Sequence, residues 1–135
     1  MSKDWVKDIN EMQTKYGVPE WIAKATEDQL RSYLEFRIEF LKEELDETEA
    51  ALINLDAEEI VDGLIDLCVV AIGTLDSFGI DPYKAWDRVL KANMAKEVGV
   101  KKERPNPLGL PDLIKPKGWK GPDHTGNHGN ITDNI

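Results

Sequence analysis

The sequence predicts an all-α fold: an antiparallel bundle of four helices followed by an irregular C-terminal extension rich in proline and glycine. Apolar residues recur at helical spacing through most of residues 1–98, and no stretch shows the alternation of a β-strand. Residues 99–135 hold five of the seven prolines and six of the ten glycines. We therefore expect one domain over residues 1–98 and an extended tail over 99–135.

The first predicted helix covers about residues 3–15. Tyr16, Gly17 and then Pro19 are expected to end it, because glycine and proline both interrupt helices. The apolar residues that share one face of this helix are Trp5, Ile9 and Met12.

The second predicted helix begins near Thr26, which has capping-box spacing to Gln29, and it ends near Asn54. A stripe of apolar residues runs along its length for about 25 residues. The stripe consists of Leu30, Leu34, Ile38, Leu41, Leu45 and Leu52.

The third and fourth predicted helices follow the caps Asp56 and Asp81-Pro82. The third ends at Gly79, and the fourth runs to about Lys96. Apolar residues surround the third helix almost completely, so we expect it to be buried on all sides. These residues are Ile60, Val61, Leu64, Ile65, Leu67, Cys68, Val69, Ile72 and Leu75.

The net charge of -9 comes from one segment. From Glu43 to Tyr83 there are 12 acidic residues and no basic one. Clustered carboxylates repel phosphate backbones and anionic membrane surfaces, so neither nucleic acid nor a membrane is expected as the partner. The N-terminus has no apolar leader, and the only cysteine, Cys68, has apolar neighbours typical of a core thiol rather than a reactive one. Both observations favour a cytoplasmic protein.

Two acid pairs stand out within this segment. Glu44 and Glu47 lie on the second predicted helix, and Glu59 and Asp62 on the third, each pair at i, i+3. Residues at this spacing lie about 60° apart around a helix, so each pair shares a face. Asp66 extends the second pair by one turn. Because a short turn joins the two helices, their acid faces are expected to meet.

Carboxylates that face each other repel, and the segment has no basic residue to neutralise them. Either their pKa values rise or a hard divalent cation binds. Without a nearby His or Cys, Mg²⁺ or Mn²⁺ is favoured over zinc or copper. A di-iron bundle is excluded because both histidines lie in the tail, and an EF-hand loop is absent.

A structural interpretation competes with the metal site. In so acidic a chain, some acids simply form a solvated face, and Glu59 has capping-box spacing to Asp56. The acids assigned to the solvated face are Glu43, Asp46, Glu49 and Glu58.

The fourth predicted helix brings back positive charge and amide donors with Arg88, Lys91, Asn93 and Lys96. Lys96 suits a phosphate contact, and equally a favourable charge at a helix C-terminus. Aromatic residues suit either a stacked base or the core. They are Trp5, Trp21, Phe36 and Phe40, of which Phe40 is the best base candidate because it lies one turn before Glu44.

Taken together, Glu44/Glu47, Glu59/Asp62 and the run Asn93-Met94-Ala95-Lys96 resemble the all-α nucleoside triphosphate pyrophosphohydrolases of the MazG-like and phosphoribosyl-ATP pyrophosphohydrolase-like type. The resemblance covers about residues 3–97. It is strongest to bacteriophage-encoded members, whose tails contain similar Lys-Pro and Gly-Trp pairs.

The resemblance implies Mg²⁺-dependent hydrolysis of a (deoxy)nucleoside triphosphate, with (d)GTP as a candidate, to the monophosphate and pyrophosphate. Mn²⁺ is expected to substitute for Mg²⁺, at two to three ions per site, in a homodimer or homotetramer in the host cytoplasm. Water would attack the α-phosphorus. The implied metal ligands are Glu44, Glu47, Glu59 and Asp62, with Asp66 as a further ligand; Glu47 is the implied general base.

For the substrate, the implied phosphate contacts are Asn93 and Lys96, with Lys91 as a weaker candidate. The base-binding candidates are Phe40, Ile9 and Trp5. Two alternatives stay open: a phosphoribosyl-ATP pyrophosphohydrolase, and a non-catalytic helical oligomerisation module whose acidic stripe binds a basic partner.

Overall fold

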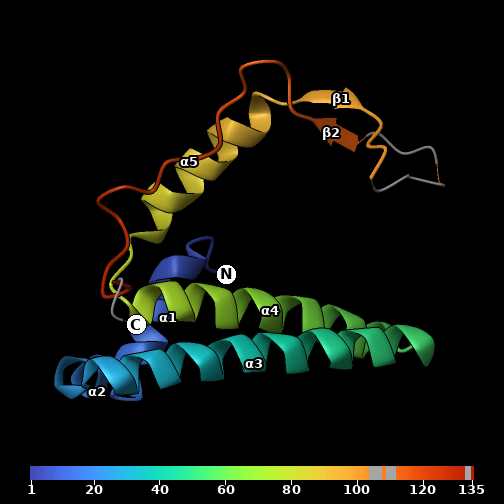
Figure 1. Cartoon of the computed structure of the whole chain (residues 1–135). Coiled ribbons are helices and arrows are strands. Elements are labelled where there is room, and N and C mark those ends of the chain that lie inside the picture. Colours follow the sequence, from blue (N-terminus) through green and yellow to red (C-terminus); the bar gives the residue numbers. More distant parts are fainter. Residues whose placement is uncertain (104–107, 109–111, 133–134) are drawn as a thin grey trace. The chain divides into compact units, whose positions relative to one another are not determined.

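Five helices and one pair of short strands make up the part of the chain that the computed structural model describes, residues 1–103, 108, 112–132 and 135 (Figure 1). The chain forms two compact units. One consists of Met1–Pro82 with His128–Ile135, and the other of Tyr83–Asn127. The predicted all-α class is confirmed. The predicted domain boundary after residue 98 stays a prediction.

Helix α1 (Trp5–Lys15) begins at Asp4, whose carboxylate accepts the Lys7 N–H at 3.0 Å. Helix α2 (Val18–Lys24) was not expected from the sequence. Gly17 ends α1 with a positive φ of 75°, as predicted, but Pro19 lies in the first turn of a new helix. Proline is tolerated there because the first-turn N–H groups have no helical acceptor.

Helices α3 (Glu27–Ile53) and α4 (Ala57–Ser77) lie side by side and antiparallel (Figure 1). The predicted capping box is present: the Thr26 N–H donates to Gln29, and the Gln29 N–H donates to the Thr26 hydroxyl. Asp56 caps α4 as predicted, accepting the Glu59 N–H at 3.2 Å. The short turn between these helices makes them neighbours.

A buried polar network joins α1, α3 and α4 near the end of α4. The Gln13 side chain donates to the Ser77 hydroxyl at 2.6 Å and to the Gly73 carbonyl at 3.0 Å. The Tyr33 and Ser77 hydroxyls lie 2.8 Å apart. Phe78, which is fully buried, follows directly. Because the buried polar atoms satisfy one another, the network fixes how the three helices pack.

The prediction that α4 is buried on all sides is wrong for this single chain. Val61 is 63% exposed, Leu64 52% and Ile65 45%. Helices α1 and α3 cover only part of the α4 surface, and apolar periodicity does not say what covers the rest. No single helix in the described ranges is both long enough and apolar enough to cross a membrane.

The second unit contains helix α5 (Pro82–Met94) and the strands β1 (Glu97–Gly99) and β2 (Asp112–Ile114). The strands pair antiparallel, with Val98 opposite Leu113. The sequence shows no β pattern here, because three residues are too few to show an alternation. Helix α5 begins where predicted but ends at Met94, before Lys96.

The tail after β2 is partly docked on the second unit. Among the apolar residues of the tail, Trp119 packs on α5, where its indole N–H donates to the Ala92 carbonyl at 2.8 Å. Leu113 and Ile114 lie in β2. Leu108 is exposed, and Leu110 lies outside the described residues.

Candidate active site

Helices α3 and α4 approach closely at Gly63. A Cβ at this glycine would lie 3.2 Å from the Thr48 Cβ and closer still to the Thr48 hydroxyl oxygen. That hydroxyl is directed at its own helix, donating to the Glu44 carbonyl at 2.7 Å. Gly63 directly follows Asp62, and Thr48 directly follows Glu47. The close approach therefore occurs at the two predicted acid pairs.

The pKa of Glu44 is raised by burial and by the acidic residues around it. Burial raises the pKa of the Glu44 carboxyl above its ordinary value of 4.5, and the negative charges of Asp66, Glu47 and Asp62 raise it further, with a smaller effect from Glu43. The structure thus brings together carboxylates from both helices. Among them, Asp66 has the largest effect on Glu44, although the sequence had ranked it as an additional ligand.

Glu59 is exposed. It is absent from the charges that shift the Glu44 pKa. The proposed capping box for Glu59 is only half formed: its N–H donates to the Asp56 carboxylate, but the Asp56 N–H donates to the Ala51 carbonyl at 2.9 Å. The Glu59 carboxylate therefore does not accept a hydrogen bond from the Asp56 N–H.

The donor set suits a hard divalent cation. Glu44, Glu47, Asp62 and Asp66 offer only oxygen ligands, and none of them takes part in an ion pair within the described residues. As the side chains stand, no three acid, histidine or cysteine groups in the described ranges are arranged to hold one ion. Glu47 and Asp62 are exposed, so their side chains can turn without disturbing packed neighbours.

Two of the three base-binding candidates share a pocket. Trp5 and Ile9 of α1 line a pocket of about 230 Å³ against α4, together with Ile65 and Val69. Ile65 directly precedes Asp66 in the sequence, and the acid that lines the pocket is Asp8. Cys68 also lines it and is half-buried, which places the thiol among apolar neighbours as expected.

Phe40, the third candidate, does not line this pocket. It packs edge-on against Phe36, with ring centroids 6.3 Å apart. The Arg37 guanidinium lies 5.7 Å from the centroid of the Phe40 ring. The structure therefore brings Trp5 and Ile9 together and leaves Phe40 in a separate aromatic group.

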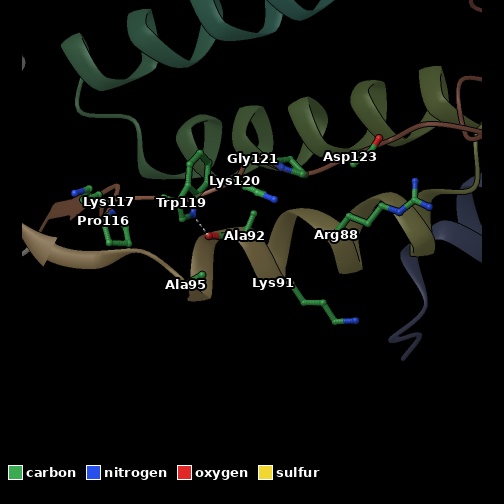
Figure 2. A pocket seen from close by; sticks show the side chains of 12 residues that line it. Arg88, Lys91, Ala92, Ala95, Pro116, Lys117, Trp119, Lys120, Gly121 and Asp123 are labelled. Atoms are coloured by element: carbon green, nitrogen blue, oxygen red, sulfur yellow. Dashed lines mark hydrogen bonds between the residues drawn. The ribbon is translucent and has the colours of Figure 1, made fainter.

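The phosphate-binding candidates all lie in the second unit, on or just after α5. Lys91 is exposed, forms an ion pair with Asp87 at 3.0 Å and projects away from Trp119 (Figure 2). Asn93 is exposed, and its carbonyl accepts the Lys96 N–H at 3.1 Å. Lys96 is half-buried, with its ammonium nitrogen 5.2 Å from the centroid of the Trp119 ring.

Sequence reasoning missed Arg37, a cation within the face of α3 that packs on α4. Its guanidinium donates to the Val70 carbonyl and to the Thr74 hydroxyl, both at 3.0 Å. Gly73 makes room for it, because a Cβ there would lie 2.8 Å from an Arg37 nitrogen. The available signal was a lone arginine inside an apolar stripe, one turn after Tyr33.

A profile of the phosphoribosyl-ATP pyrophosphohydrolase family matches residues 12–93. The match spans more than half of the 135 residues, and the chain belongs to this family, within the MazG-like all-α NTP pyrophosphohydrolase superfamily. The protein is therefore a nucleotide pyrophosphohydrolase. It has no significant match among curated proteins or among solved structures.

We predict that Gly63→Ala lowers the free energy of unfolding by about 1–3 kcal/mol, because the new methyl group overlaps Thr48. Thr48→Ala removes the nearest atom and should restore part of the loss in the double variant, giving a favourable coupling energy. Urea unfolding of the two single variants and the double variant measures this. A Gly63→Ala protein as stable as the wild type would contradict the packing.

The raised pKa of Glu44 gives a pH prediction for the metal-free protein. A carboxyl whose pKa is higher in the folded state stabilises the fold at low pH, and this contribution is lost as the pH rises through the folded pKa. In EDTA, Glu44→Gln should raise Tm at pH 7–8, and the gain should disappear below pH 4.5. Thermal unfolding across pH tests this, with Glu49→Gln controlling for net charge. An equal gain at every pH would refute it.

Proposed function

We propose that this member of the phosphoribosyl-ATP pyrophosphohydrolase family hydrolyses a (deoxy)nucleoside triphosphate to the monophosphate and pyrophosphate, with (d)GTP as the first candidate. The observation that carries the proposal is the group of carboxylates from α3 and α4: burial raises the pKa of Glu44, and the negative charges of its neighbours raise it further. Such a group is stabilised by cations, and a triphosphate is the kind of substrate that arrives with them.

Glu44, Glu47, Asp62 and Asp66 would hold Mg²⁺, with Mn²⁺ as a substitute, and Glu59 is the outer candidate ligand. Two or three ions bound there would neutralise the phosphate charge and lower the pKa of a bound water. The donor set supports this choice because every ligand is a hard oxygen.

Glu47 is the proposed general base. It takes a proton from the water whose oxygen attacks the α-phosphorus. The bond from the α-phosphorus to the bridging oxygen breaks, and the electron pair leaves with pyrophosphate. Asn93 and Lys96 supply donors that stabilise the negative charge of the phosphate chain, with Lys91 as a weaker candidate.

The pocket lined by Trp5 and Ile9 is the proposed base site. An aromatic ring and aliphatic side chains provide the apolar surface on which a base packs, and Ile65 in its lining adjoins Asp66. Phe40 is the alternative stacking residue.

Phosphoribosyl-ATP is an equally good candidate substrate, because the matching family profile carries that name. It undergoes the same bond cleavage. A screen of the canonical (d)NTPs and phosphoribosyl-ATP for pyrophosphate release, with Mg²⁺ and with Mn²⁺, decides between them. Activity on phosphoribosyl-ATP alone would replace the triphosphate proposal.

We predict that Glu47→Gln reduces kcat by at least about 10²-fold, because the amide cannot accept the proton from the attacking water. The far-UV CD spectrum should stay helical, since Glu47 is exposed. Glu49→Gln, on the same helix and also exposed, is the matched control and should keep wild-type turnover. Full activity of Glu47→Gln would refute the assignment.

We also propose that the protein is a homodimer or homotetramer, and that it acts in the cytoplasm, which is the host cytoplasm for a phage-encoded member. The exposed apolar surface of α4 at Val61, Leu64 and Ile65 supports oligomerisation, because burying it in a second copy removes it from water. Light scattering should give at least twice the 15.3 kDa chain mass, and Leu64→Glu should shift it toward the monomer. A wild-type monomer would contradict the proposal.

A further inference from the structure

Trp119 connects the tail to the end of α5. Its indole N–H donates to the Ala92 carbonyl at 2.8 Å (Figure 2). The last carbonyls of a helix have no partner within it, so this bond satisfies one of them. The indole is consequently fixed at the helix end by a residue 27 positions later in the chain.

Two ammonium groups lie near this one ring. The Lys96 nitrogen is 5.2 Å from the ring centroid, and the Lys115 nitrogen is 5.0 Å from it. Cation–π attraction favours each contact, but two like charges beside the same ring repel each other. Neither lysine takes part in an ion pair within the described residues. An anion bound near the ring would remove this repulsion.

The surrounding unit is positively charged. Residues 83–127 contain ten of the 17 Lys and Arg residues of the chain and only five acids. An open pocket of about 740 Å³ beside Trp119 adds further cationic side chains, and one carboxylate, Asp123, also lines it (Figure 2). The cations lining the pocket are Arg88, Lys91, Lys117 and Lys120.

We propose that Lys96, Lys115 and Trp119 form a binding site for the pyrophosphate group of the nucleotide. Lys115 is a phosphate contact contributed by the tail, and Trp119 is a positioning residue that holds both ammonium groups. A pyrophosphate group carries several negative charges and so matches two ammonium groups better than one. The inference rests on the proposed function in that the substrate carries a pyrophosphate group. The family profile ends at residue 93, before all three residues.

The first test uses the full-length protein and inorganic pyrophosphate as the probe. For Lys115→Gln we expect the inhibition constant of pyrophosphate and the KM of the nucleotide to rise roughly tenfold, with kcat nearly unchanged, because one charge-assisted contact is lost. Lys102→Gln removes the same charge from a lysine that does not lie over the Trp119 ring, and it is the matched control. Equal constants for the two variants would overturn the proposal.

The second test separates positioning by Trp119 from a merely structural role. Trp119→Phe keeps an aromatic face for the lysines but loses the bond to Ala92, whereas Trp119→Leu loses both. We expect the Trp119→Phe protein to retain most of the affinity for pyrophosphate. The Trp119→Leu protein should lose as much affinity as the Lys115→Gln protein. If the CD spectrum shows that the Trp119→Leu protein does not fold, the pyrophosphate affinities of the Trp119→Phe and Lys115→Gln proteins still test the proposal. Wild-type affinity in the Leu variant, or equal losses in Leu and Phe, would refute positioning by the ring.

Calorimetric titration of pyrophosphate keeps this test independent of catalysis. If no nucleotide is hydrolysed, the proposed function fails, yet the Lys115→Gln and Lys102→Gln proteins can still be compared for pyrophosphate binding. If turnover is present and these variants bind equally, only the tail site fails.

Discussion

The close contact between Gly63 and Thr48 determines how near the two acid-bearing helices approach. Carboxylates on facing helices repel one another, and that repulsion favours separating α3 from α4. The opposing force comes from the other end of α4. There, Gln13, Tyr33 and Ser77 form a buried network, and Arg37 bonds to the α4 backbone. The well-satisfied end holds the helix pair together, so the acid end keeps its negative charge close without an internal cation.

Local signals in the sequence were sufficient for the helix starts, because a cap depends only on residues three positions apart. Thr26 and Gln29 form both hydrogen bonds of a capping box, and Asp56 accepts the Glu59 N–H. Failures arose where local rules leave two outcomes. Gly17 followed by Pro19 stops one helix and starts the next, and the apolar residues around α4 do not specify a covering surface. Strands of three residues carry no detectable period.

Some features of the candidate site could likewise be predicted from the sequence, and others could not. Spacing of i, i+3 was enough to place Glu44 with Glu47 and to orient Asp62, since the helix period alone determines those faces. The effect of Asp66 on Glu44 required the actual helix crossing, because it acts between helices. The Lys96, Lys115 and Trp119 group was hidden for another reason. Its members meet only through the return of the tail, whose path no periodic pattern encodes.

An overall charge of -9, taken alone, disfavours a polyanionic substrate. The acids are concentrated in residues 43–83, whereas residues 83–127 carry a net positive charge. The second unit has twice as many basic as acidic residues, which is the charge that the proposed phosphate contacts require. The acids of α3 and α4 instead attract cations, and a metal-bound nucleotide presents both kinds of charge. An excess of carboxylates is thus compatible with the proposed polyphosphate substrate if the acids bind metal ions and separate lysines bind the phosphates, and net charge alone is a poor guide to such a substrate.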